Sequence, residues 1–388
     1  MTRRLLVLGL LGVGCIVWVG AASASPGALA AEHKIGYRIL RVPREGAEPM
    51  VVAFWYPAKG GQGSVTYQLP TTALASDAAP DAPPAEGPFP LVIYCHGGGG
   101  CGLMGATFAE ALAESGFVVA APDFSDEFTV MDSDSTERPT LARVAEWLKW
   151  AHGASSGVAR GGGAVKYEHR PREVRAAIDY VLAQSADPRS PLAGLVDPDR
   201  IGAMGVSFGA WTTQAVAGFI PAFRDERVKA AVPIAGNPGV RAGSLAAVRI
   251  PVMIVFGEEE HLVLLEQDSP VKTEGMIESY ESAHTPKFLV GIEGARHLDF
   301  GGAGVTGRGR RAAGAPSSRD VRRDDPVIGT VNHYCIAFFR RYLLGDEAAG
   351  EALTRQVPRA FILKADPGDK GPAAPRDADA PCDVGQHR

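Results

Sequence analysis

The sequence predicts an α/β fold in which a mostly parallel sheet is covered by helices on both faces. Short, fully apolar runs typical of buried parallel strands alternate with amphipathic segments of helical length. Glycine-rich or polar segments follow several of these runs directly, where the strands of such a sheet end. With 388 residues, of which 46% are hydrophobic and 21% charged, the chain can bury one large core or two small ones.

The order of the predicted elements also favours a parallel sheet, because strand and helix alternate along most of the chain. Right-handed crossovers between such strands give a doubly wound sheet, and its ligands bind at the carboxyl ends of the strands. A further helix is expected directly after Ser207. We expect strands at 37–42, 50–56, 91–95, 117–121, 200–206, 228–234, 251–256 and 287–292, and helices at 105–115, 172–184 and 332–344.

The first 30 residues predict an export signal. Arg3 and Arg4 precede an uncharged apolar run at 5–20, and small residues after it offer cleavage sites near residue 24 or 30. The run is short for a membrane span, so we expect the signal to be removed. The predicted product is a secreted or periplasmic protein with no stable membrane anchor.

An exported chain can keep disulfide bonds. Cys95, Cys101, Cys335 and Cys382 remain after removal of the signal. Cys335 and Cys382 are a candidate pair, since a bridge between them would tie down a polar C-terminal tail. Cys95 fits a buried strand better.

One α/β domain is expected at 31–364, followed by a polar, flexible tail at 365–388. The segment 126–169 falls outside the strand–helix alternation and is a candidate cap insertion over the site. Two further segments predict irregular loops. Segment 71–90 is rich in Ala, Pro and Asp, and segment 301–325 is rich in Gly and Arg. The formal net charge of −5 provides no basic field that would attract nucleic acid.

Residues 205–209, Gly-Val-Ser-Phe-Gly, match the pattern G-x-S-x-G between an expected strand and an expected helix. In this setting the serine sits on a tight turn that exposes its hydroxyl, and the flanking glycines leave the turn enough room. The N-terminus of the following helix favours developing negative charge. The motif makes Ser207 the candidate nucleophile; the alternative is a glycine-rich turn without chemistry.

Four glycines follow His96 at the end of the 91–95 strand. Acyl transfer passes through an oxyanion that needs N–H donors, and glycines let the backbone come close to it. We expect the backbone N–H groups of Gly98 and Phe208 to form this oxyanion hole, with His96 buttressing the loop. A phosphate-binding loop is a poor alternative, because no Gly-Lys-Ser/Thr ending follows.

A serine nucleophile needs a base, which in this arrangement comes last, after the serine and the acid. His297 follows the 287–292 strand in a loop at the carboxyl edge of the sheet, so it is the candidate base. The competing histidines are His261, His284, His333 and His387.

Three glutamates follow the 251–256 strand and Gly257, where a carboxylate can orient the imidazole of the base. Glu260 is the preferred acid; Glu258 and Glu259 are the alternates, and a solvated charge run is the other interpretation. This acidic run beside a single histidine lacks the ligand framework of a metal site. We therefore expect neither a metal nor a cofactor.

Five segments together resemble the platelet-activating factor acetylhydrolase and dienelactone-hydrolase-like group of serine esterases, which have the α/β-hydrolase fold. The resemblance extends from about residue 37 to 345, and its motifs are specific for fold and mechanism rather than for substrate. The chain also resembles, more distantly, secreted bacterial polyester hydrolases and cutinases. The five segments are 94–98, 116–122, 170–174, 205–209 and 296–300.

The resemblance implies ester hydrolysis through an acyl-enzyme, with Ser207 and His297 in the matching positions and Gly98 as the second oxyanion donor. Dienelactone hydrolases have a cysteine at the position of Ser207, which argues against lactone activity. The acetylhydrolases place an aspartate after the preceding strand, where this chain has Ala-Gly-Asn at 235–237. That difference favours Glu260 as the acid and weakens the phospholipid assignment.

The expected function is therefore hydrolysis of small or exposed carboxylic esters by a catalytic domain without a cofactor. The short connection at 236–250 leaves little room for a lid, although a cap at 126–169 would reverse this preference. Polyester hydrolysis, phospholipid acetylhydrolysis, and amide or peptide hydrolysis by the same triad are alternatives. A binding protein on the same scaffold is an alternative of another class.

Overall fold

The computed structural model describes residues 33–368, except for 62, 70–71, 128, 136–138, 141, 144, 147–166, 237–243, 261–272 and 302–314. The expected export signal at 1–30, most of the candidate cap at 126–169 and nearly all of the expected tail at 365–388 lie outside this part. Within it, no helix has both the length and the apolar character needed to cross a membrane.

Ten strands form one sheet, in the order β12-β11-β10-β9-β8-β6-β7-β2-β1-β5. The strands from β7 to β11 along this order are mutually parallel, whereas β2 and β12 pair antiparallel with their neighbours. The strands are β1 Lys34–Arg44, β2 Ala47–Ala58, β5 Ala79–Pro80, β6 Phe89–Cys95, β7 Val118–Pro122, β8 Val196–Val206, β9 Val228–Ile234, β10 Val252–Glu259, β11 Lys287–Arg296 and β12 Ala360–Asp366. A separate hairpin joins β3 Val65–Gln68 to β4 Ala73–Ser76.

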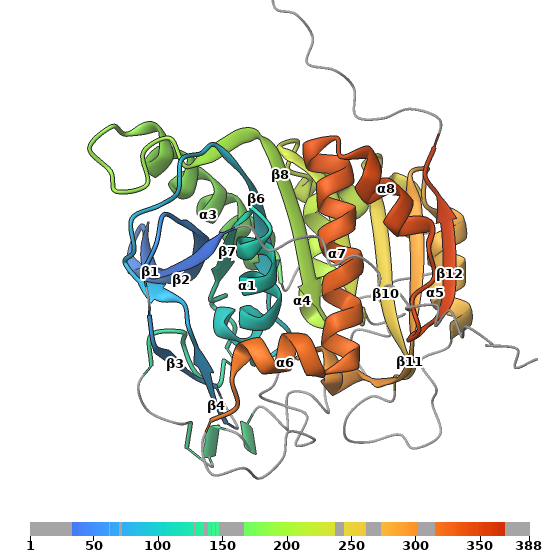
Figure 1. Cartoon of the computed structure of the whole chain (residues 1–388), viewed down its shortest axis with the longest axis horizontal. Coiled ribbons are helices and arrows are strands. Elements are labelled where there is room, and N and C mark those ends of the chain that lie inside the picture. Colours follow the sequence, from blue (N-terminus) through green and yellow to red (C-terminus); the bar gives the residue numbers. More distant parts are fainter. Residues whose placement is uncertain are drawn as a thin grey trace, which may run out of the picture.

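Helices cover both faces of the sheet, as Figure 1 shows. On β6, Val92 and Tyr94 pack into the core that contains α1 and α7, whereas Leu91, Ile93 and Cys95 pack against α3. Successive strand residues point to opposite faces, so a strand buried on both faces is apolar throughout. The helices are α1 Ala106–Glu114, α3 His169–Ala186, α4 Phe208–Gln214, α5 Thr273–Ser282, α6 Ser318–Asp324, α7 Pro326–Leu344 and α8 Glu347–Thr354.

The predicted fold class is confirmed, and so are all the predicted strands and helices. Most observed elements begin or end a few residues beyond the predicted bounds. The clearest example is α7, which starts at Pro326 rather than at residue 332. The sequence analysis missed β3, β12, α5 and α8, which are short or lie at the rim of the core.

The predicted loop at 301–325 is wrong for its last part, which forms α6. This helix is held by the buried carboxylate of Glu110 in α1, which accepts a hydrogen bond from the Ser318 hydroxyl. Arg322 contributes an ion pair to the same carboxylate, with a distance of 3.4 Å between its Nη2 and Glu110 Oε2. The partner of the helix is thus more than 200 residues away in the chain, as the separation of 208 shows, and local composition does not reveal it.

The predicted loop at 71–90 is also wrong in part, because β4 and β5 lie within it. The backbone of β4 pairs with β3 and also bonds to the segment before α6, where Ala75 N–H donates to the Pro316 carbonyl at 2.9 Å. Such strands depend on distant partners rather than on strongly apolar sequence.

The described cysteines are buried thiols. Cys95 lies in β6, as predicted. Cys335 lies buried inside α7, and Cys382, its predicted partner, lies outside the described residues, so this pairing stays a prediction.

Candidate active site

Ser207 lies at the sharp turn between β8 and α4, at the carboxyl edge of the parallel strands, which is the lower edge of the sheet in Figure 1. Its backbone has φ 58° and ψ −117°. A residue other than glycine rarely adopts this conformation, which costs about 1–3 kcal/mol. The Ser207 N–H donates to the Ile234 carbonyl at the end of β9 at 2.9 Å, so the neighbouring strand holds the strained turn in place.

The two glycines of the G-x-S-x-G motif are required by close backbone packing. A Cβ on Gly205 would lie 2.5 Å from the Gly209 carbonyl oxygen. A Cβ on Gly209 would lie only 1.9 Å from the Cys95 carbonyl oxygen at the end of β6. The motif therefore presses the turn against the start of the loop that follows β6.

His297 is the histidine that the structure brings to Ser207. Its Nε2 lies 2.9 Å from Ser207 Oγ, a hydrogen-bonding distance, although the two residues are 90 positions apart. His297 directly follows β11 and opens a single helical turn, His297–Phe300. The buried Asp299 caps this turn by accepting the Arg296 N–H at 2.9 Å. The cap holds the histidine at the edge of the sheet.

The three adjacent glutamates differ in their surroundings. Glu260 is only 3% exposed, and its carboxylate accepts a long hydrogen bond of 3.5 Å from the Gly257 N–H. Glu258 and Glu259 are exposed, and Glu258 accepts the Gly294 N–H at 2.9 Å. Burial thus distinguishes Glu260 from both alternates.

The register of the sheet places Glu260 beside His297. Glu259 of β10 pairs with Arg296 of β11 after a local irregularity in the parallel ladder. The residues that follow, Glu260 and His297, therefore leave neighbouring strands at the same level, and such strands lie about 4.8 Å apart. Among the described residues no hydrogen bond joins Glu260 to His297, so the structure brings Glu260 near His297 without the contact that would complete a triad.

The loop after β6 lies against Ser207, since a Cβ on Gly97 would be 3.5 Å from Ser207 Cβ. His96 is fully buried beneath this loop. Its Nδ1 donates to the Gly97 carbonyl at 2.7 Å, and its Nε2 accepts the Phe124 N–H at 3.1 Å. Burial, with the nearby Arg170 guanidinium, lowers the pKa of His96 to about 3. A neutral, doubly bonded imidazole of this kind buttresses the loop.

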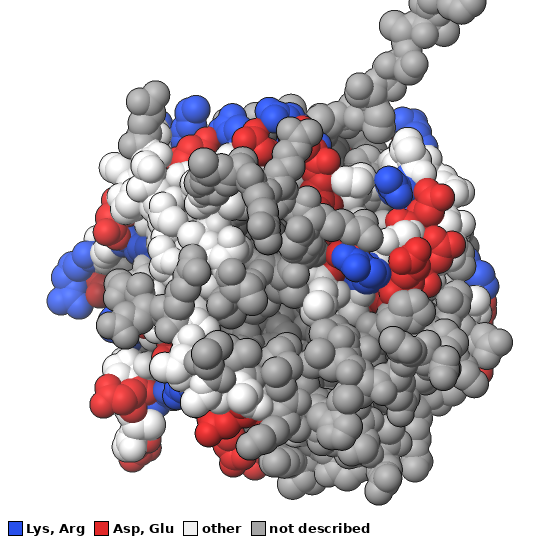
Figure 2. Space-filling model, turned by 90° about the horizontal axis from the view of Figure 1, so that it is seen from below, with Lys and Arg blue, Asp and Glu red and all other residues white. Residues whose placement is uncertain are grey.

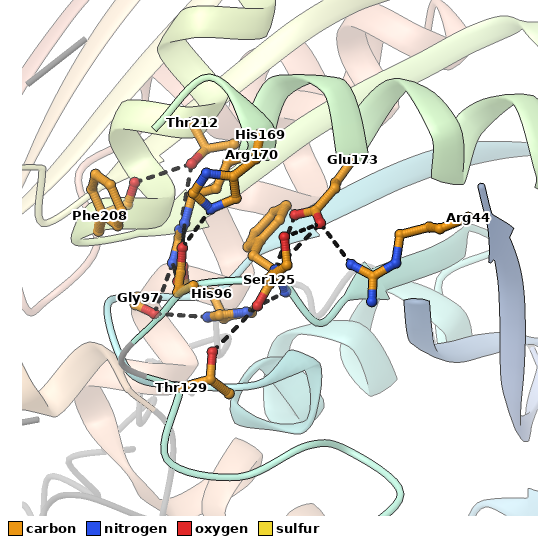
Figure 3. A network of polar contacts seen from close by, with 12 residues as sticks. Arg44, His96, Gly97, Ser125, Thr129, His169, Arg170, Glu173, Phe208 and Thr212 are labelled. Carbon is orange, nitrogen blue, oxygen red and sulfur yellow. Dashed lines mark hydrogen bonds and ion pairs between the residues drawn. The ribbon is translucent and has the colours of Figure 1, made fainter. Parts of the chain in front are cut away.

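Sequence reasoning missed a buried polar network behind the same loop. Figure 3 shows Arg170 and Glu173 of α3 reaching from their helix toward His96, Gly97 and Ser125. Arg170 is fully buried and pairs with Asp126. Burial alone would raise the pKa of Asp126, but the Arg170 guanidinium outweighs it and holds this pKa well below its ordinary range.

Few features of the amino-acid sequence indicate this buried polar network. Arg170 belongs to one of the five segments that resemble known esterases, but nothing local shows that it is buried, and its partner Asp126 is 44 positions away.

The competing histidines that the structure describes lie elsewhere. His284 precedes β11 and so lies at the opposite edge of the sheet, where its Nε2 contacts the Ala246 carbonyl at 3.0 Å. His333 lies within α7, where burial lowers its pKa. His261 and His387 fall outside the described residues. In the described part of the chain, no cluster of three or more His, Cys, Asp or Glu side chains could hold a metal ion.

Figure 2 views the molecule from the carboxyl edge of the sheet. Acidic and basic side chains are interspersed over the described part of this face. A mixed surface of this kind does not generate an extended field of one sign.

The close packing at Gly209 leads to a stability prediction. We expect Gly209→Ala to lower the free energy of unfolding by about 3 kcal/mol, because the added methyl overlaps a backbone carbonyl that cannot move alone. Gly60→Ala is the matched control, since a Cβ there meets nothing within 4 Å. Urea unfolding of both variants measures the difference, and equal midpoints would contradict the packing argument.

Two families match this chain over its central part. The platelet-activating factor acetylhydrolase isoform II family matches residues 62–232, and the PET hydrolase-like family matches residues 163–306. The first match includes the loop after β6 and Ser207, and the second includes Ser207, Glu260 and His297. A comparison with curated proteins found no match. The fold, the Ser207–His297 pair and the two family matches together identify the chain as a carboxylic ester hydrolase of the serine hydrolase class with the α/β-hydrolase fold.

Proposed function

We propose that this esterase is exported and hydrolyses small or exposed carboxylic esters through an acyl-enzyme, without a cofactor. The observation that supports this most directly is the 2.9 Å contact between Ser207 Oγ and His297 Nε2 at a strained strand-to-helix turn. A serine hydroxyl is a weak nucleophile until a base removes its proton, and this imidazole is placed to do so.

The proposed reaction has two stages. Ser207 Oγ attacks the ester carbonyl while His297 takes its proton, and His297 then returns that proton to the departing alcohol. Water attacks the resulting acyl-enzyme with His297 again as base, which releases the carboxylic acid and restores Ser207. The backbone N–H groups of Gly98 and Phe208 would stabilise the oxyanion that forms in each stage.

Glu260 is the proposed acid of the triad. Its burial and its register position beside His297 support this role over that of Glu258 or Glu259. A carboxylate there would hold the imidazole in the correct tautomer and stabilise the imidazolium that forms during the reaction.

Polyester hydrolysis is a second candidate function. The PET hydrolase-like match supports it, because that match spans all three proposed catalytic residues. The short connection between β9 and β10 also favours an open site that an exposed ester of a polymer could enter.

A panel of p-nitrophenyl esters from acetate to palmitate, with the anilide that corresponds to the best ester, tests the proposed reaction. We expect kcat/KM to be highest for the short acyl chains, to be much lower for the anilide, and to vanish in Ser207→Ala. A clear preference for long chains would refute the small-ester proposal. Faster cleavage of the anilide would make the protein an amidase, and full activity of Ser207→Ala would remove the proposed nucleophile.

Exchange of the proposed acid gives a second prediction. We expect Glu260→Gln to lower kcat by about 100-fold or more, because the neutral amide no longer stabilises the imidazolium. Glu259→Gln is the control, since this neighbouring glutamate is exposed and should change kcat by less than about twofold. An equal effect of the two substitutions on kcat would assign the acid to another residue.

A further inference from the structure

A fully buried ion pair lies directly behind the loop that supplies Gly98. Arg170, at the start of α3, donates from Nε to Asp126 Oδ1 at 2.9 Å and from Nη2 to Asp126 Oδ2. His169 Nε2 contacts the same carboxylate at 2.9 Å. A bidentate pair fixes the plane of the guanidinium, so the remaining N–H groups of Arg170 point in defined directions.

Those remaining N–H groups point at the backbone of the loop, as Figure 3 shows. Arg170 Nη1 donates to the His96 carbonyl at 2.9 Å, and Nη2 lies 3.5 Å from the Gly97 carbonyl oxygen. The Gly97 carbonyl also accepts from His96 Nδ1 at 2.7 Å and from the Gly100 N–H at 3.2 Å.

These contacts determine where the N–H of Gly98 points. Gly97 C=O and Gly98 N–H belong to one planar trans peptide, in which the two groups point in opposite directions. Donors that hold the carbonyl on the side of Arg170 and His96 therefore turn the N–H of Gly98 to the other side. Donation by a charged group also polarises the peptide and strengthens its N–H as a donor.

The same guanidinium contacts the residue of the other proposed oxyanion donor. Its Cζ lies 4.1 Å from the centre of the Phe208 ring, a cation–π distance, and Nη1 lies 3.4 Å from Thr212 Oγ1. Thr212 Oγ1 in turn donates to the Phe208 carbonyl at 3.3 Å. One side chain thus joins the loop after β6 to the first turn of α4.

We propose that Arg170 is a positioning residue that sets the geometry of the oxyanion hole by orienting the Gly97–Gly98 peptide relative to Phe208, with Asp126 anchoring the guanidinium. This role rests on the proposed function, since it requires Gly98 and Phe208 to be the donors. A buried ion pair contributes little net stability compared with apolar residues of similar size, so stability alone does not account for an ion pair behind this loop.

The test compares Arg170→Gln and Arg170→Lys with Arg172→Gln in the full protein. Arg172 is on the same helix, but its side chain is 70% exposed, and among the described residues its ion-pair partner is Glu168 in the preceding turn. For each variant, the measurements are kcat and KM with a short p-nitrophenyl ester, Ki for a trifluoromethyl ketone that forms an oxyanion adduct with the serine, and the urea unfolding midpoint.

For Arg170→Gln we expect kcat to fall about 100-fold and KM to change less than about threefold. This pattern is expected when a substitution removes stabilisation of the transition state but leaves substrate binding intact. Ki for the ketone should rise in parallel with the loss of kcat/KM. Arg170→Lys should lower kcat about tenfold, because the lysine ammonium keeps the positive charge but lacks the planar set of N–H donors of a guanidinium. Arg172→Gln should match the wild type.

A purely structural role would lower the unfolding midpoint without changing kcat or Ki of the folded protein. That result would overturn the proposal, as would a rise in KM alone, or a loss of kcat with unchanged Ki.

If Arg170→Gln does not fold, Asp126→Asn replaces it. The same loss of kcat and of ketone affinity is expected for this variant, and wild-type kcat in folded Asp126→Asn would overturn the proposal. Absence of ester hydrolysis by the wild type would instead refute the proposed function.

Discussion

The contact on which the site depends is the one between the turn around Ser207 and the end of β6. Gly209 and Gly205 allow the backbone of this turn to approach the Cys95 carbonyl more closely than any side chain would permit. The approach holds Ser207 in a backbone conformation that a serine does not adopt freely, and it places the glycine loop beside the hydroxyl. The proposed nucleophile and the proposed oxyanion loop are thus positioned by one packing constraint.

A buried ion pair lies close to this contact, behind the glycine loop. Asp126 and Arg170 are buried together, and the uncharged His96 occupies the remaining space under the loop. Unpaired, either charge would cost several kcal/mol in this environment. In contrast, an ion pair between exposed side chains, such as Arg323–Asp320, stabilises the folded state by about 1 kcal/mol or less.

Much of the fold and part of the site could be predicted from the sequence, because both depend on local patterns. Apolar runs identified the central strands, and G-x-S-x-G and His297 each follow such a run directly. Glu260 could be preferred over Glu258 and Glu259 from the sequence, but the burial and the register of β10 with β11 that support this preference are visible only in the structure. Arg170 was missed for a related reason: a buried arginine is rare, and its pairing with Asp126 is visible only in three dimensions. The edge elements β4, β5 and α6 likewise depend on distant partners.

Covalent labelling of the folded protein with a fluorophosphonate, followed by peptide mapping, tests most directly whether the turn, the loop and His297 together activate Ser207. We predict one adduct per chain, on Ser207, and labelling that is at least about 100-fold slower in His297→Ala, because the serine then lacks its base. No adduct on the folded protein, an adduct on another residue, or an unchanged rate in His297→Ala would contradict this account.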